Sequence, residues 1–207
     1  MSLFRVDNPV IQLLGKLMQL VLLNLLMLLC SLPVVTIGAA ITAGHYTALK
    51  IRRNEGYVLQ NFWNSFKENL LQATVLWIVI LVNAGIAFGA YRVAGLVGGT
   101  VGSLIMVVII AMFIVTLFCY MWLYPLLSKF RNTIWMTMKN AYILSFRYLF
   151  RTLYMVMVTL IPIILLEALT LNWYIALFLL FGLSLPTYWS VLMYDKVFES
   201  IESAQNK

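Results

Sequence analysis

Charged residues are scarce in this sequence of 207 residues: Asp, Glu, Lys and Arg together make up 10% of it, against about 25% in ordinary soluble domains. No charged residue occurs from Leu17 to Leu49, and hydrophobic residues make up 63% of the chain. A soluble domain of this size cannot bury so long a run, whereas a bilayer core about 30 Å thick takes about 20 apolar residues per helix. The composition therefore excludes a soluble globular domain. It predicts an all-α, polytopic membrane protein with a single domain over residues 1–207.

Residues that usually carry chemistry are also few. The chain has one His and two Cys, and Cys30 and Cys119 both lie in apolar runs, where a free Cys packs as a small hydrophobe. The sequence contains no phosphate-binding glycine loop and no His-Glu-x-x-His pattern, and no carboxylate lies near His45 to complete a nucleophilic triad. We therefore expect no catalytic residues, no metal and no cofactor. The net charge of +7 fits an inner membrane surface and requires no nucleic acid.

The distribution of Lys and Arg predicts the topology. Residues 50–67 and 129–151 are rich in Lys and Arg, and the second stretch has no acidic residue, so both are expected on the cytoplasmic side. Residues 92–102 hold one basic residue and residues 167–172 hold none. Both stretches are therefore expected outside. The N-terminus, with Arg5 and Lys16, and the tail after Tyr194 are then both cytoplasmic.

Two cytoplasmic ends require an even number of spans, and six is the prediction. The second span is short and rich in Gly, Ala and Thr, so a re-entrant half-helix with five full spans is the alternative. Pro33 suits the first position of that helix, with Ser31 as its N-cap. The spans are expected near residues 16–32, 33–51, 70–91, 93–128, 152–166 and 168–194.

Two basic, aromatic segments resemble one another. Phe62-x-x-Ser65-Phe66-Lys67 is matched by Tyr142-x-x-Ser145-Phe146-Arg147, and each precedes a span that begins inside. Both are expected to form short amphipathic helices on the cytoplasmic surface, either by duplication or because any such surface needs aromatics and cations. They would bind anionic lipid or dock a cytoplasmic partner. The candidate residues are Arg52, Arg53, Phe62, Phe66, Lys67, Tyr142, Phe146, Arg147 and Arg151.

Polar groups and helix breaks inside the spans form the second candidate site. Ionisable groups are costly in a membrane, and His45 is the one histidine. It is either a neutral helix contact or a proton-relay or substrate contact, while Glu167 is expected in the solvated outer turn. Transporters often place broken helix ends at the substrate. The candidate residues are Asn24, Pro33, Thr36, Gly38 and His45.

The segment from Asn24 to Tyr46 carries a family resemblance. It reads Asn24-Leu25-Leu26, then Leu28-Leu29-Cys30-Ser31-Leu32-Pro33, then Thr36-Ile37-Gly38-Ala39-Ala40, followed by Ala43 and Tyr46. This pattern resembles the YesL-like family of bacterial membrane proteins, a domain of unknown function. The resemblance implies the cytoplasmic membrane of Gram-positive bacteria and an accessory role beside carbohydrate importers of the ATP-binding-cassette (ABC) type. It transfers no catalytic or ligand residue.

Three hypotheses follow. The first is a non-enzymatic accessory or scaffold protein that packs against an ABC sugar permease through faces of small residues and the cytoplasmic segments. The second is a small transporter or channel, as a homodimer, with a site near Pro33 and Gly38. The third is an intramembrane enzyme, which would need His45 and Glu167 to converge, and the predicted topology opposes that. Small residues spaced by four, such as Gly85 and Gly89, allow close helix packing within the chain or between copies.

Overall fold

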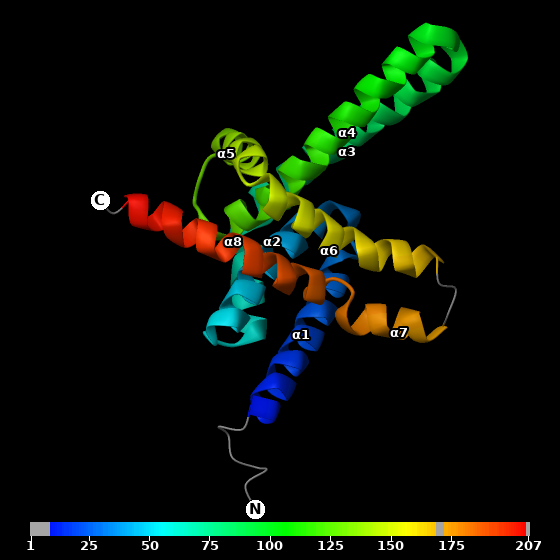
Figure 1. Ribbon diagram of the computed structural model, residues 1–207. Coiled ribbons are helices and arrows are strands. Elements are labelled where there is room, and N and C mark those ends of the chain that lie inside the picture. The colour runs from blue at the N-terminus through cyan, green and yellow to red at the C-terminus, as the bar shows by residue number, and fades with distance from the viewer. Residues whose placement is uncertain (1–8, 169–171, 206–207) are drawn as a thin grey trace, which may run out of the picture.

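The computed structural model describes residues 9–168 and 172–205, and that part of the chain is built from helices without a strand, as the sequence predicts (Figure 1). The elements are α1 (Pro9–Ser31), the short 3₁₀ helix η1 (Val34–Thr36), α2 (Ile37–Arg53), α3 (Val58–Val97), α4 (Gly99–Lys129), α5 (Ile134–Arg147), α6 (Leu149–Ala168), α7 (Asn172–Phe181) and α8 (Ser184–Gln205).

The helices give four to six candidate membrane spans. Four are long and apolar enough by themselves: Ile11–Ser31, Val34–Arg53, Val58–Val97 and Gly99–Lys129. The pair α5 and α6 and the pair α7 and α8 each pass the same test as a bent unit, with bends of 101° and 47°. The chain is therefore a multi-pass membrane protein, and the predicted alternatives of six and five spans both fall within this range.

Helix α2 lies at the centre of the fold. Within its apolar window 61% of the residues are buried by the rest of the protein, compared with 22% for α1. Its buried positions are almost all Gly, Ala or Thr, and such small side chains let neighbouring helices approach closely. The helix ends at Asn54, whose left-handed backbone (φ 55°, ψ 40°) directs its N–H toward the carbonyl groups of Lys50 and Ile51, a common helix stop.

The turn before α2 differs from the prediction. Pro33 does not open α2 behind a Ser31 cap; it precedes η1, with φ −75° and ψ 115°, and α2 follows at Ile37. Proline has no backbone N–H, so it suits this position as well as the start of a longer helix. With η1, the second span has 20 residues and measures about 30 Å, enough to cross the hydrocarbon core.

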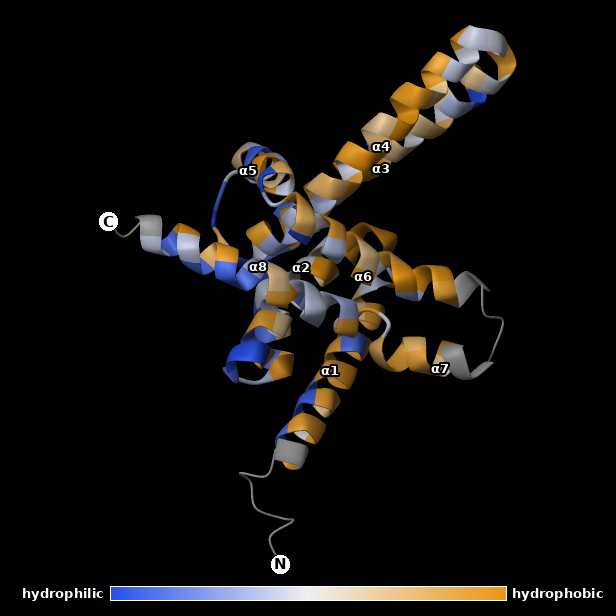
Figure 2. Cartoon of the chain, viewed as in Figure 1, coloured by the Kyte–Doolittle hydropathy of each residue, from blue (hydrophilic) through white to orange (hydrophobic). Residues whose placement is uncertain are grey.

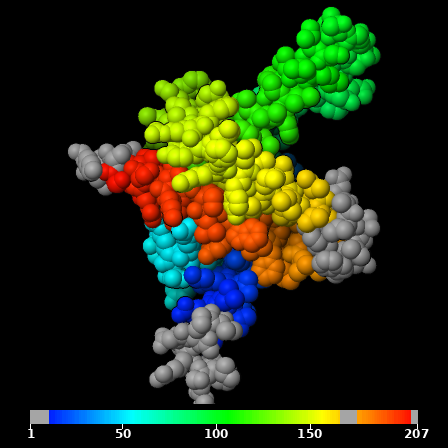
Figure 3. Space-filling model, in the orientation of Figure 1, coloured from blue at the N-terminus to red at the C-terminus, as the bar shows by residue number. Residues whose placement is uncertain are grey.

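Helices α3 and α4 form a long hairpin that extends away from the other helices (Figures 1 and 3). With 40 and 31 residues they measure about 60 and 46 Å. The tip turns at Gly98 and Gly99, whose φ angles of +61° and +57° are readily adopted by glycine alone. The outer part of the hairpin is mostly hydrophobic (Figure 2) and exposes large side chains such as Phe88 and Leu104.

The two basic, aromatic segments do not share a shape, which the sequence did not predict. Residues 62–67 are the first turns of α3 and continue without a break into its apolar part. No Pro or Gly interrupts them, and helix growth is cooperative once begun. Residues 142–147, in contrast, end α5, and the chain turns through 101° at Tyr148 into α6.

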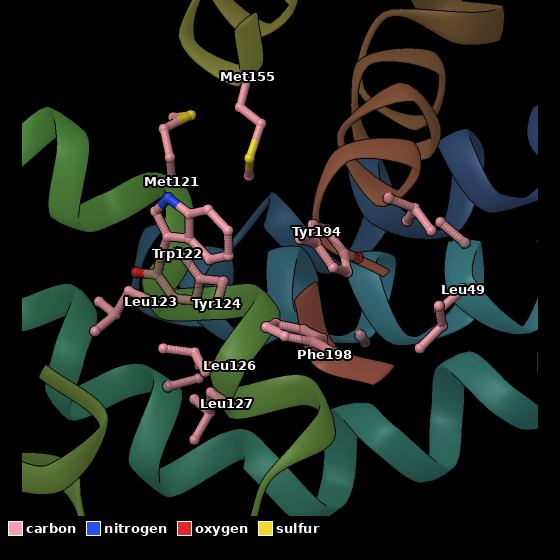
Figure 4. Close-up of a cluster of buried hydrophobic side chains, with 14 of the residues drawn as sticks. Leu49, Met121, Trp122, Leu123, Tyr124, Leu126, Leu127, Met155, Tyr194 and Phe198 are labelled. Carbon is pink, nitrogen blue, oxygen red and sulfur yellow. The ribbon is translucent and has the colours of Figure 1, made fainter. Parts of the chain in front are cut away.

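Aromatic side chains fill the centre of the core (Figure 4). Tyr194 and Phe198 of α8 pack with their ring centroids 4.9 Å apart and their planes tilted by 41°, and Phe198 meets Trp122 of α4 edge-on at 6.4 Å. All three side chains are fully buried. The indole of Trp122 donates to the hydroxyl of Thr152, at 2.8 Å, so α4, α6 and α8 are fixed to one another here.

Candidate functional site

Asn24, in the middle of α1, is fully buried and binds the break between α7 and α8. Its amide nitrogen donates to the carbonyl groups of Phe178 and Leu179, at 3.2 and 2.7 Å. Its amide oxygen accepts the backbone N–H groups of Leu183 and Ser184, at 2.8 and 2.9 Å. One side chain thus satisfies backbone groups that both helix ends leave free.

Thr36 and Gly38 act locally at the start of α2. The Thr36 hydroxyl lies 2.7 Å from the carbonyl oxygen of Cys30 and 2.8 Å from that of Pro33, so it closes the turn between α1 and α2. Gly38 lies against α3: a Cβ atom there would be 2.5 Å from the carbonyl oxygen of Ala73. Neither residue reaches the α7–α8 break, so the predicted set divides into two groups.

His45 of α2 belongs with Asn24. Its Nδ1 is 3.3 Å from the hydroxyl of Tyr194 on α8, and the two rings are 5.7 Å apart. His45 also lines a cavity of about 130 Å³, together with Thr159 and Ser190. The wall of this cavity includes Gly182 and Leu183, the two residues of the break that Asn24 holds. The sequence placed Asn24 and His45 in one candidate site, and the structure brings them to the same helix break.

The size of this cavity limits what it can hold. A water molecule occupies about 30 Å³ of liquid, and sites for small organic molecules are typically about 300–1,000 Å³. A volume of about 130 Å³ therefore fits a few waters or one very small solute. The hydroxyl groups of Thr159, Thr187 and Ser190 supply polar contacts for such an occupant.

Arg52 and Arg53 lie at the end of α2 and pair with α8. Arg53 donates to the carboxylate of Asp195 at 2.7 Å, and Arg52 Nε lies 3.4 Å from its other oxygen. Asp195 is 3% exposed, while Glu199 is a further, more distant partner of Arg53 at 3.6 Å. Sequence reasoning missed Asp195; the signal was one carboxylate directly after the last apolar run.

The first basic, aromatic segment is partly buried in the core. Phe62 is fully buried and stacks near Phe66, with 6.1 Å between ring centroids. Lys67 is exposed and lies over the ring of Trp63, at 5.4 Å. Trp63, which the sequence analysis did not select, is 45% exposed and is the aromatic residue of this segment that best fits an interfacial position.

The second segment is more open. Tyr142 and Phe146 are about half exposed and lie 5.0 Å apart between ring centroids. Arg147 and Arg151 both lie over the Tyr148 ring, at 5.8 and 5.4 Å from its centroid. Arg151 also donates to the Met193 carbonyl group at 2.9 Å, so its guanidinium is tied to α8.

Metal-ligating side chains do not gather within the part of the chain that the structure describes: no group of three or more His, Cys, Asp or Glu occurs there. Cys30 and Cys119 are unpaired thiols. The side chain of Glu167 lies outside the described residues.

Comparisons with known proteins give one match. Residues 20–91 match the family described as "Protein of unknown function, DUF624". The matched part runs from α1 through α2 into α3 and includes Asn24 and His45, but not their partners on α7 and α8. No curated protein and no solved structure matches the chain.

Proposed function

We propose that this protein is a non-enzymatic accessory or scaffold subunit of the bacterial cytoplasmic membrane, and that it packs against an ABC-type carbohydrate permease. The observation that carries the proposal is the use of the polar side chains within the apolar part. They bind this chain's own backbone and side chains, whereas the outer surface of the long hairpin is apolar and uncovered.

Four residues illustrate this internal use. Asn24 uses all four of its hydrogen-bonding positions on α7 and α8, Thr36 closes the adjoining turn, His45 contacts Tyr194, and Arg53 pairs with Asp195. Groups committed in this way stabilise helix packing. They are less available for transport, because transport needs polar side chains that can exchange their partners for the substrate.

The sugar-related part of the proposal depends on the resemblance to YesL-like proteins. The match of residues 20–91 to a family of unknown function is consistent with that resemblance. Accessory proteins of importers need an apolar flank for the permease and a cytoplasmic face, and the α3–α4 hairpin and α5 would supply them.

Affinity purification in mild detergent tests this function. The full chain, tagged at one end, is expected to recover permease subunits from its native membrane. Recovery of the chain alone, with full expression of the permease, would refute the scaffold role. A His45→Ala variant should leave both recovery and sugar uptake nearly unchanged, and uptake lost at normal expression would contradict the proposal.

The proposed topology, with both termini in the cytoplasm, has its own test. Single Cys residues introduced next to Arg52 and Arg147, in a background without Cys30 and Cys119, should resist a membrane-impermeant thiol reagent in intact cells. They should react after permeabilisation. Labelling in intact cells would overturn the topology.

A small transporter or channel, as a homodimer, is the second candidate function. The cavity beside His45 favours it, because it lies at the break between α7 and α8 and broken helices often form transport sites. A Thr187→Val variant removes one hydroxyl from the cavity wall. Loss of transport of a small solute in proteoliposomes, with the fold retained, would favour this function over the scaffold.

A further inference from the structure

Helix α5 lies across the direction of α6. The angle between them is 101°, and α6 has 20 residues, about 30 Å, which matches the thickness of the hydrocarbon core. If α6 stands upright in the bilayer, α5 therefore lies almost flat at its surface. The bend is held by Thr152, whose hydroxyl accepts from Trp122 and lies 2.9 Å from the Ser145 carbonyl oxygen.

A hollow of about 420 Å³ lies between α5 and the base of the α3–α4 hairpin. It is about three times as large as the His45 cavity, and it falls in the range of sites that hold whole organic molecules. Most of its wall is apolar. The apolar wall residues are Leu76, Val79, Ile80, Val115, Leu123 and Met138.

The edge of the hollow that α5 forms also carries polar and charged groups. Trp135, Lys139 and Tyr142 line the hollow from this helix, and Trp135 is 77% exposed. Trp and Tyr favour the level of the lipid headgroups, because their rings are apolar with a polar edge. Lys139 is exposed and brings a positive charge to the same rim.

Lys139 differs from other bases of this region. Lys129 pairs with Glu202 at 3.0 Å, Arg131 pairs with Glu68 at 3.0 Å, and Arg151 binds a backbone carbonyl group. Across the part of the chain that the structure describes, Lys139 has no ion pair and no hydrogen bond from its ammonium group. Lys139 therefore lines the hollow with an ammonium group that is placed to meet an anion.

We propose that this hollow is a binding site for one anionic phospholipid. One acyl chain lies against the α3 and α4 walls, the phosphate meets the ammonium group of Lys139, and Trp135 and Tyr142 lie beside the glycerol. An apolar trough with one free cation at its mouth matches the two-part chemistry of such a lipid. The site does not depend on which protein partner the chain has.

Native mass spectrometry of the full chain in detergent tests the site. Phosphatidylglycerol and phosphatidylcholine with identical acyl chains are titrated separately. We expect one tightly held phosphatidylglycerol per chain. Lys139→Gln should weaken its binding about fivefold, the effect of one base near an anionic headgroup, and should leave phosphatidylcholine unchanged. Thr116→Phe, which fills the hollow from α4, should weaken both lipids.

Lys196→Gln is the matched control. Lys196 is an exposed base on α8 and does not line the hollow, so its variant should bind phosphatidylglycerol like the unaltered chain. Equal weakening by the Lys196 and Lys139 variants would overturn the site in favour of diffuse attraction. Unchanged lipid binding by a folded Thr116→Phe variant would also overturn it. If Thr116→Phe does not fold, the two lysine variants decide the outcome.

Discussion

Helices α2 and α4 are opposites in composition and in surroundings. The apolar window of α2 has a mean hydropathy of 1.2 and is 61% buried, whereas that of α4 has a mean hydropathy of 2.9 and is 6% buried. The least hydrophobic span therefore lies inside the protein, and the most hydrophobic one faces outward. In a membrane, lipid solvates apolar side chains as well as protein does, so close packing of small residues selects the buried helix.

Two asparagines show the same contrast in their hydrogen bonds. Asn24 binds four backbone groups of α7 and α8, more than 150 positions away in the chain. Asn83 on the hairpin donates to the carbonyl group of Val79 in its own helix, at 3.0 Å. Asn24 thus links segments that are distant in the chain, whereas Asn83 makes its hydrogen bond within its own helix.

The largest expected effect comes from Asn24→Leu. It removes four hydrogen bonds and leaves the free ends of α7 and α8 without partners in an apolar setting, at a cost of about 3 kcal/mol. The measurement is the thermal midpoint of the detergent-solubilised protein, read by size-exclusion chromatography after heating. Asn83→Leu is the control and should lower the midpoint little; equal losses would show that the two asparagines act alike.

Asp195→Asn should have the next largest effect. The change removes the negative charge that Arg52 and Arg53 share and leaves both cations facing a neutral amide. Because Asp195 is buried while the arginines are about one-third exposed, we expect a loss of about 2 kcal/mol rather than the full cost of a buried charge. The thermal midpoint of the Asp195→Asn variant, compared with that of the unaltered protein, measures this loss of stability.

Glu199→Gln is the matched control for that prediction. Glu199 is 59% exposed and lies 3.6 Å from Arg53, and exposed ion pairs contribute little. Its midpoint should stay near that of the unaltered protein. A fall as large as that of Asp195→Asn would place the important partner at the surface instead.

Gly38→Ala tests the packing of α2. A Cβ atom at Gly38 would meet the backbone oxygen of Ala73 at 2.5 Å, and backbone cannot move aside cheaply, so a loss of about 1.5 kcal/mol is expected. At Gly44 the added atom would meet the end of the Met27 side chain, which can rotate away. At Gly85 on the hairpin it meets nothing within 4 Å.

The midpoints of these three alanine variants should therefore fall in the order Gly38, Gly44, Gly85, with the greatest loss at Gly38. The three substitutions are chemically identical, so differences in their midpoints report the surroundings of each glycine. A large loss at Gly85 would mean that this face of the hairpin packs against another helix, which the isolated chain does not contain.

What the sequence could predict depended on local signals. Long uncharged runs indicated the candidate spans, and a turn was predicted within residues 92–102, where the structure places the tip of the hairpin at Gly98 and Gly99. Asn24 and His45 could be selected because polar groups stand out in apolar runs. Their partners could not be found, because Leu183 and Tyr194 meet them only after the whole chain has folded.

The two basic segments mark the limit of such reasoning. Their residue patterns are nearly the same, yet one continues straight into α3 and the other ends before a 101° bend. The bend depends on Thr152, which binds Trp122 across the fold and Ser145 behind it. The local pattern around residues 142–147 contains neither contact, so it could not predict the shape.

The smallest expected effect concerns Lys50 and Glu55, the exposed counterpart of the buried pair at Asp195. The hydrogen bond and charge of Lys50 lower the pKa of Glu55 from its usual value of 4.5. A lowered pKa in the folded state means that the pair stabilises the fold at neutral pH, and that this contribution is lost as the pH falls below the usual value and through the lowered one. The Glu55 side chain is about half exposed to solvent, and exposed ion pairs contribute little, so Glu55→Gln should hardly change the midpoint at pH 7 and should slightly flatten its decline in acid. A pH series of thermal midpoints measures this, and a marked drop at neutral pH would show that the loop after α2 contributes as much as the contacts of its buried face.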